Sequence, residues 1–240
     1  MKRLICALAA VAVLCVPAFA LSNSEYLKMK KDSAFNAADG HLTRAYNQAK
    51  SSMSTSDFEK LKREQRQWIA EGRDKEAKRL MRNGFDKPGA YTDATLNRAR
   101  EIYSKIPLSS VSQSVRAEDF IGTYYNGNYV CMTIWREDRE FEKKRPKGVL
   151  SVGFSIPRIN GPDLFGRPRG NILEAEFDYD NDELMALVKY ESGIKKEGNL
   201  DIRARLIMLN KYAIKVEASP DLDSLFGTTS GIFLREEEDE

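Results

Sequence analysis

The hydrophobic pattern of the chain changes its period near the middle. From residue 33 to about 106, apolar side chains recur every three or four positions, as they do along one face of an α-helix. From about residue 120 to 234 they alternate with polar residues or form short runs between turn residues, which is typical of β-strands. The sequence therefore predicts an α+β protein, in which an N-terminal three-helix unit precedes an antiparallel β-barrel-like or meander domain.

Three helices are predicted in the first half, and a short connection makes the first two an antiparallel hairpin. They cover residues 35–53, residues 56–81 and a stretch from residue 92 or 93 to 106. Ser56 and Glu59 have the spacing of a capping box, and Asn83 with Gly84 is expected to end the second helix. Pro107 stops the third helix, which we expect to cover the open face of the hairpin.

The second half contains eight strand candidates with no helix-length pattern between them. They lie near residues 120–125, 129–136, 149–154, 172–179, 184–191, 202–209, 212–218 and 231–235. Turn-forming residues at 126–128 and 179–182 favour antiparallel neighbours. We expect an up-and-down meander curled into a barrel or half-barrel, with a two-sheet sandwich as the alternative. A barrel of this size holds packed side chains or one small apolar ligand.

The first twenty residues have the features of a secretion signal. Lys2 and Arg3 precede an apolar run of about 13 residues, whereas crossing a bilayer takes roughly 20. Ala18 and Ala20 provide the small side chains that signal peptidase requires. We therefore expect export, cleavage after Ala20 and no stable membrane anchor.

The expected organisation of the chain has five parts. They are a signal peptide at 1–20, a helical domain at 21–107, a Ser-rich linker at 108–117, a β domain at 118–235 and an acidic tail at 236–240.

Composition narrows the chemistry that the protein can perform. The chain has 38 Lys and Arg against 36 Asp and Glu, and removal of Lys2 and Arg3 leaves 36 against 36. The exported chain would then have a formal net charge of zero, which makes nucleic acid an unsuitable partner. His41 is the single histidine, which excludes a multi-histidine metal centre. Cys131 would be the one cysteine of the exported chain, so no internal disulfide is expected. Without a recognisable catalytic motif, we expect no enzyme activity, no cofactor and no metal.

The helical half carries three short motifs, at residues 38–46, 61–69 and 73–74. Together they resemble the lysozyme inhibitor LprI-like N-terminal domain. The matching residues are Asp39, Leu42, Tyr46, Gln65, Arg66 and Trp68. Residues 95–100 are similar to the closing segment of that family. The resemblance implies an envelope protein, here in the periplasm of a Gram-negative bacterium, and some relatives are described as inhibitors of lysozyme.

Two features depart from the family pattern. The family usually has cysteines that tie its helices together, and none occurs here between Ala20 and Cys131. In addition, Arg73 and Asp74 lie one residue further from Trp68 than in the family. Because one residue turns an α-helix by about 100°, Arg73 and Asp74 would face a different direction from that of the family pair unless the chain bulges near Gly72.

Each motif residue has a structural interpretation and a binding interpretation. Tyr46 and Trp68 lie on apolar stripes and are expected to pack across the hairpin, although an exposed pair would suit a partner. Gln65 and Arg66 are expected to join neighbouring acids in an internal network, although they also suit a carboxylate or a glycan.

A long connection at residues 157–170 is the second candidate contact surface. Arg158, Arg167 and Arg169 give it positive charge, and Phe165 gives it an apolar anchor. Lysozyme places two carboxylates in its cleft, so an arginine-bearing loop is a physically sensible plug. An ordinary connecting loop is the alternative.

These observations favour a protein that acts by surface contact. We expect an exported binding protein, either a lysozyme inhibitor or another protein that interacts with the envelope. The alternative is a carrier that holds a small apolar ligand or a lipid inside the barrel.

Overall fold

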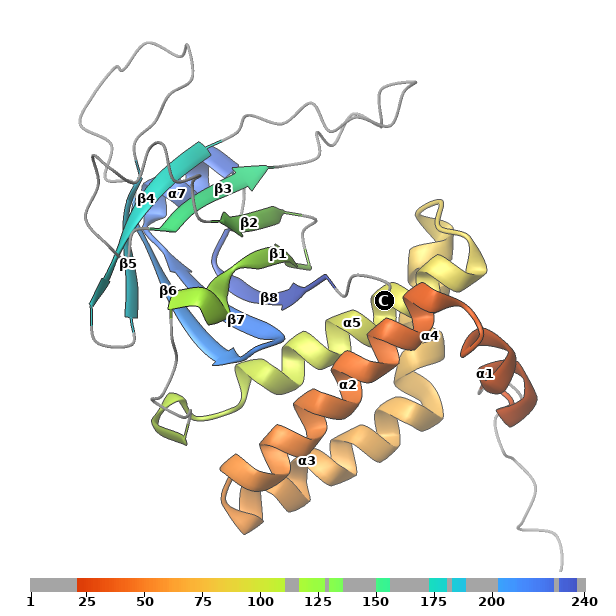
Figure 1. The fold of residues 1–240 in the computed structure, drawn as a ribbon. Helices are drawn as coiled ribbons and strands as arrows, with labels where there is room; N and C mark the ends of the chain where they lie inside the picture. Colours follow the sequence, from red (N-terminus) through yellow and green to blue (C-terminus); the bar gives the residue numbers. More distant parts are fainter. Residues whose placement is uncertain are drawn as a thin grey trace, which may run out of the picture.

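The structure, a computed structural model, has the expected α+β architecture. It describes residues 21–110, 117–127, 130–135, 150–155, 173–180, 183–188, 203–226 and 229–236. The helices come first along the chain and form a bundle beside the barrel that the strands build (Figure 1). No helix in these described ranges has an apolar stretch long enough to cross a membrane.

The helical domain is built from a short helix and a bundle of longer ones. Its elements are α1 (Asn23–Met29), α2 (Ser33–Ser52), α3 (Thr55–Gln67), the π-helical turn η1 (Trp68–Gly72), α4 (Arg73–Arg82) and α5 (Lys87–Ser104). Two short 3₁₀ turns follow, at Leu108–Ser110 and Ala117–Phe120. The hairpin prediction is confirmed, since α2 and the continuous α3–η1–α4 helix match its two members, while α1 was not predicted.

Two helix starts differ from the sequence prediction. The second helix is capped two residues earlier than expected, because Ser54 Oγ accepts the Asp57 amide at 3.1 Å and leaves Ser56 inside the helix. Helix α5 begins at Lys87 because the Asp86 side chain accepts the Gly89 amide at 3.0 Å and Pro88 suits the first turn.

The strands form a closed antiparallel barrel in sequence order, which confirms the up-and-down prediction. In the part of the chain that the structure describes they are β1 (Gly122–Tyr125), β2 (Cys131–Trp135), β3 (Leu150–Ser155), β4 (Leu173–Asp180), β5 (Glu183–Val188), β6 (Arg203–Asn210), β7 (Ala213–Ala218) and β8 (Gly231–Arg235). The barrel closes where Tyr124 and Tyr125 of β1 pair with Arg235 and Leu234 of β8. A helix that was not predicted, α7 (Pro220–Phe226), lies between the last two strands.

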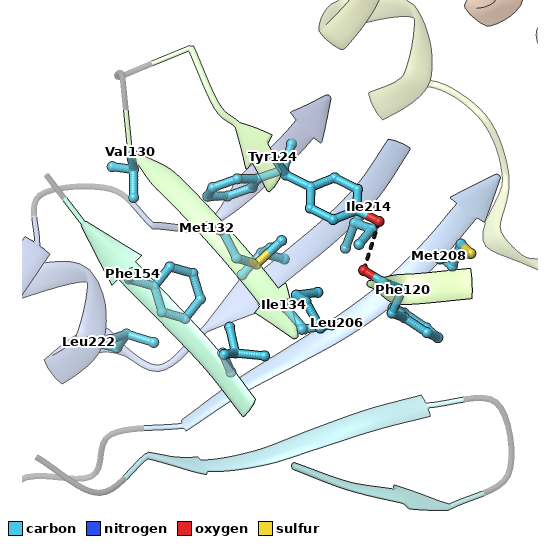
Figure 2. Packing of buried hydrophobic residues seen from close by; sticks show 14 residues of the cluster. Phe120, Tyr124, Val130, Met132, Ile134, Phe154, Leu206, Met208, Ile214 and Leu222 are labelled. Atoms are coloured by element: carbon cyan, nitrogen blue, oxygen red, sulfur yellow. Dashed lines mark hydrogen bonds between the residues drawn. The ribbon is translucent and has the colours of Figure 1, made fainter. Parts of the chain in front are cut away.

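Buried side chains fill the described part of the barrel interior. Fourteen of them form one cluster, which includes Tyr124, Met132 and Phe154 (Figure 2). The rings of Phe154 and Phe233 meet edge to face with centroids 6.4 Å apart. The Tyr124 hydroxyl donates to the carbonyl of Phe120 at 2.9 Å, so this buried polar group is satisfied.

The helical domain covers the outside of the barrel at strands β6, β7 and β8. One apolar cluster joins residues of α2, α3 and α5 to outward-facing residues of these strands, and we call it the interface cluster. Its buried members are Ala45, Ala49, Leu61, Ala99, Ile102, Tyr103, Ile106, Leu209, Ala213, Ile232 and Leu234. Where the helices meet them, these strands are therefore buried on both faces, and the two halves of the chain share this apolar cluster.

Side-chain hydrogen bonds fix the position of the helices on the barrel. Gln48 of α2 donates to the carbonyl of Leu209 at 2.9 Å, and the Asn210 amide lies 3.0 Å from the Tyr103 hydroxyl. His41 of α2 is 3% exposed, and its Nε2 lies 2.9 Å from the carbonyl of Arg235, to which it donates. Burial lowers the pKa of His41 to about 4, and the positive charge of Arg44 adds to this effect.

The lowered pKa of His41 makes the stability of this interface depend on pH. In the unfolded chain the histidine binds a proton near pH 6.5, so the stability present above that pH is lost as pH falls towards 4. We expect the free energy of unfolding of the wild type to fall by about 2–3 kcal/mol more than that of His41→Gln between pH 7 and pH 4. Urea unfolding followed by circular dichroism at both pH values measures this difference, and equal losses would contradict it.

Candidate functional site

A π-helical turn interrupts the long helix of the hairpin at the family motif. In this turn the amide of Arg73 bonds the carbonyl of Trp68, five residues earlier, instead of the carbonyl four residues earlier. The turn absorbs one extra residue, and a π-bulge of this kind is frequent at functional sites. The bulge therefore compensates for the extra residue that separates Arg73 and Asp74 from Trp68.

Gly72 allows the indole of Trp68 to lie against the helix. A Cβ atom at position 72 would lie 2.8 Å from Cδ1 of Trp68, which is closer than van der Waals contact allows. Trp68 is half-buried and is not part of the described apolar clusters. Gly72 lets the ring lie along the helix surface, and the expectation that Trp68 packs across the hairpin stays a prediction.

After the π-turn, Arg73 and Asp74 both point into the helical domain. Arg73 is 9% exposed and Asp74 is 4% exposed. The guanidinium of Arg73 lies 5.8 Å from the ring centroid of Tyr26 and 5.9 Å from that of Trp68, within cation–π range of both. The Tyr91 hydroxyl donates to Asp74 at 3.1 Å, and burial together with that carboxylate raises the pKa of Tyr91 to about 12.

Asp39, the first motif residue, fastens α1 to α2. Its carboxylate accepts hydrogen bonds from the Tyr26 hydroxyl and from the Lys30 ammonium, both at 2.9 Å. Burial and the neighbouring Asp39 raise the pKa of Tyr26 to about 12. Asp39 and Arg73 therefore both contact Tyr26, which connects the two ends of the motif.

Gln65 begins a hydrogen-bonded network that joins α3 to α5. Its side-chain oxygen accepts from Nε of Arg98 at 2.9 Å, and Nη1 of Arg98 donates to Glu101 at 2.6 Å. Lys105 then bridges Glu101 at 2.9 Å and Glu64 at 2.6 Å. Arg98 is 5% exposed, and its Nη2 has no acceptor in the part of the chain that the structure describes.

The network keeps its carboxylates ionised. The hydrogen bond from Lys105 lowers the pKa of Glu64. Burial alone would raise the pKa of Glu101, but the hydrogen bonds from Lys105 and Arg98 outweigh it and lower that pKa. At neutral pH the groups therefore act as fixed charges and hydrogen-bond partners.

This network borders an open groove with a volume of about 400 Å³. Its α3–η1–α4 side is lined by Glu64, Gln67, Trp68, Glu71, Gly72 and Lys75. Its α5 side is lined by Arg98, Glu101 and Lys105. Three carboxylates and three cations line the groove, so its formal charge is zero. An aromatic ring and paired donors and acceptors thus lie together at the centre of the family motif.

The other residues singled out from the sequence lie apart from this groove. Tyr46 and Leu42 are half-buried beside the interface cluster, and the Tyr46 ring lies 5.2 Å from that of Phe58. Arg66 is exposed. Residues 157–170, which include Arg158, Phe165, Arg167 and Arg169, fall outside the described residues, so the hypothesis about that loop stays a prediction.

Sequence reasoning missed the contribution of α5 to the groove. Arg98, Glu101 and Lys105 were not among the candidate residues. Arg98 lies between Thr95, Ala99 and Ile102 on the buried face of α5, and a charged residue inside such an apolar stripe is the pattern that would have identified it.

The fold and the groove together define an α+β protein whose helical domain combines a packed motif with an open groove. Residues 22–104, which span α1 to the end of α5, match the family model described as Lysozyme inhibitor LprI. This match confirms the resemblance found in the helical half of the sequence. A comparison with curated proteins finds no match, and a comparison with solved structures finds none either.

The contact between Gly72 and Trp68 predicts opposite effects for two glycine-to-alanine substitutions. Alanine normally stabilises a helix by about 1 kcal/mol relative to glycine, and Gly40→Ala should do so because only the flexible end of Arg44 lies near the new methyl group. Gly72→Ala should instead lower the free energy of unfolding by about 1 kcal/mol, because the clash outweighs the gain in propensity. Chemical unfolding of both variants measures the effects, and stabilisation by Gly72→Ala would contradict the assigned contact.

The two tyrosine-to-carboxylate hydrogen bonds should differ in strength. Tyr91→Phe removes the hydroxyl that donates to the buried Asp74, and we expect a loss of about 1–3 kcal/mol. Tyr26→Phe should cost less than about 1 kcal/mol, because Asp39 is more exposed and keeps the ammonium of Lys30. Urea unfolding of both variants tests this order, which a larger loss for Tyr26→Phe would reverse.

Proposed function

We propose that the protein is an exported, non-catalytic binding protein of the bacterial envelope that inhibits the action of lysozyme. The groove beside Trp68 is the proposed contact site. One observation carries this assignment. Within the segment that matches the lysozyme inhibitor family, the motif residue Trp68 lines an open groove, and the buried motif residue Gln65 bonds Arg98, which lines the same groove.

The electrostatics of the groove support binding without catalysis. A glycosidase needs a carboxylic acid whose pKa is raised towards the working pH. Here Lys105 lowers the pKa of Glu64, and the cations beside Glu101 lower its pKa too. Neither carboxyl group is therefore suited to donate a proton at neutral pH.

The packing of Leu21 supports maturation by cleavage after Ala20. Leu21 is 9% exposed and packs with Phe35, Ala77, Leu80 and Tyr91 of the helical domain. Removal of the apolar segment at residues 1–20 would leave this anchored leucine as the first residue of a periplasmic protein.

The barrel serves as a support for the helices, in keeping with the fourteen packed side chains in its described interior.

Protection of bacterial cell walls from lysozyme tests the proposed function. The purified mature protein should slow the loss of turbidity when lysozyme digests cell walls. Glu71 and Lys75 are exposed at the groove, so Glu71→Gln with Lys75→Gln should weaken protection at least about tenfold without unfolding the protein. A matched control, Glu59→Gln with Lys60→Gln, changes exposed residues of the same types on α3 and should leave protection unchanged.

Two other outcomes would change the assignment. Absence of any protection by the wild type would overturn the proposed function. Loss of protection on changing Arg158, Arg167 and Arg169 to alanine, with the groove variant fully active, would move the contact site to the loop at residues 157–170.

A further inference from the structure

The charge of the groove favours a neutral occupant. Its three carboxylates, Glu64, Glu71 and Glu101, are balanced by Lys75, Arg98 and Lys105. Lys105 contacts two of these acids and Arg98 contacts one, so much of the charge is already paired within the protein. A site of this kind has no net field that would attract a strongly cationic or anionic surface.

The polar groups of the groove are arranged for ligands that both donate and accept hydrogen bonds. Glu71 offers only acceptors, Lys75 offers only donors, and the amide of Gln67 offers both. A sugar hydroxyl donates one hydrogen bond and accepts others, so neighbouring hydroxyls can use a carboxylate and an ammonium at the same time. A neutral polyhydroxylated ligand therefore matches this lining better than an ion does.

Trp68 supplies the apolar part of such a site. Its indole is half-buried, and the absence of a side chain at Gly72 lets it lie against the helix. An aromatic ring held in this way offers an apolar face for the C–H groups of a pyranose and keeps its N–H for a hydrogen bond. The volume of about 400 Å³ lies within the range of small-molecule sites and suits a short saccharide.

The network behind the groove holds its polar groups in place before a ligand binds. Arg98 of α5 donates to Gln65 of α3 at 2.9 Å and to Glu101 of its own helix at 2.6 Å. Preorganisation of this kind reduces the entropy lost on binding. In addition, Nη2 of Arg98 is a buried donor without an acceptor among the described residues, and such groups are usually satisfied by a partner.

We propose that the groove binds a neutral N-acetylated saccharide, so that the protein shields the glycan substrate of lysozyme instead of capturing the enzyme. Trp68 stacks on a sugar ring, while Glu71, Lys75 and Gln67 bond its hydroxyl and acetamido groups. The choice of an N-acetylated sugar rests on the proposed function, because lysozyme cleaves a polymer of N-acetylated sugars. A loop of the lysozyme polypeptide is the competing occupant.

Tryptophan fluorescence of the mature protein tests this inference directly. The chain has two tryptophans, and Trp135→Phe in β2 leaves Trp68 as the only reporter. Titration with tri-N-acetylchitotriose, the N-acetylated trimer that we call chitotriose below, should produce a saturable change in fluorescence. We expect a dissociation constant below about 1 mM. Cellotriose, which lacks the acetamido groups, should bind at least about tenfold more weakly.

Matched variants connect the signal to the groove. Glu71→Gln with Lys75→Gln in the same background should weaken chitotriose binding at least about tenfold, while Glu59→Gln with Lys60→Gln should leave it unchanged. Circular dichroism confirms that each variant is folded, and calorimetry of the wild type gives a measure of binding that does not depend on fluorescence.

The possible results separate this inference from the proposed function. Protection from lysozyme without chitotriose binding would overturn the inference and leave the enzyme as the partner. Chitotriose binding without protection would support the groove as a saccharide site and overturn the proposed function. Equal binding of chitotriose and cellotriose would overturn the assignment of an N-acetylated ligand.

Discussion

Helix α5 is buried on two sides, and this constraint organises the rest of the molecule. Towards the barrel it buries Ile102 and Tyr103 in the interface cluster, and towards the other helices it places Tyr91 and Arg98. The hydrophobic contact with β6, β7 and β8 fixes the position of the helix, because displacing it would expose apolar surface on both partners. The side of α5 that carries Arg98 is thereby held against α3, and the groove depends on that arrangement.

The π-turn restores the orientation of the residues that follow it in the long helix. An additional residue in an uninterrupted α-helix would rotate Arg73 and Asp74 by about 100° away from the positions that they occupy. The turn at Trp68–Gly72 takes up this rotation, so that both residues are buried and Asp74 contacts Tyr91. The same distortion places Trp68 over Gly72 beside the groove. One local irregularity therefore serves both the packing of the motif and the shape of the candidate site.

Periodicity predicted most of the fold, because long helices and alternating strands repeat the same burial pattern many times. All eight strand candidates correspond to strands, and each strand pairs with its neighbours in the sequence, as the meander prediction required. The early start of α5 was missed because its first turn depends on the Asp86 cap rather than on apolar spacing. The candidate site was predicted only in part. Gln65 and Trp68 were visible as motif residues, whereas Arg98, Glu101 and Lys105 join them only through the packing of α5 on α3.

The burial of Arg98 is difficult to explain by stability alone. A buried guanidinium loses its hydration, and replacing a buried charged network with apolar side chains is often neutral or stabilising. Gln65 and Glu101 offset part of this loss, yet one nitrogen of Arg98 has no acceptor in the described chain. By that reasoning, apolar residues at these positions would keep α5 packed against α3 but would remove the hydrogen-bond pattern of the groove. The network is therefore better understood as a means of holding a neutral, polar recognition surface in one geometry, and that geometry is what a saccharide would require.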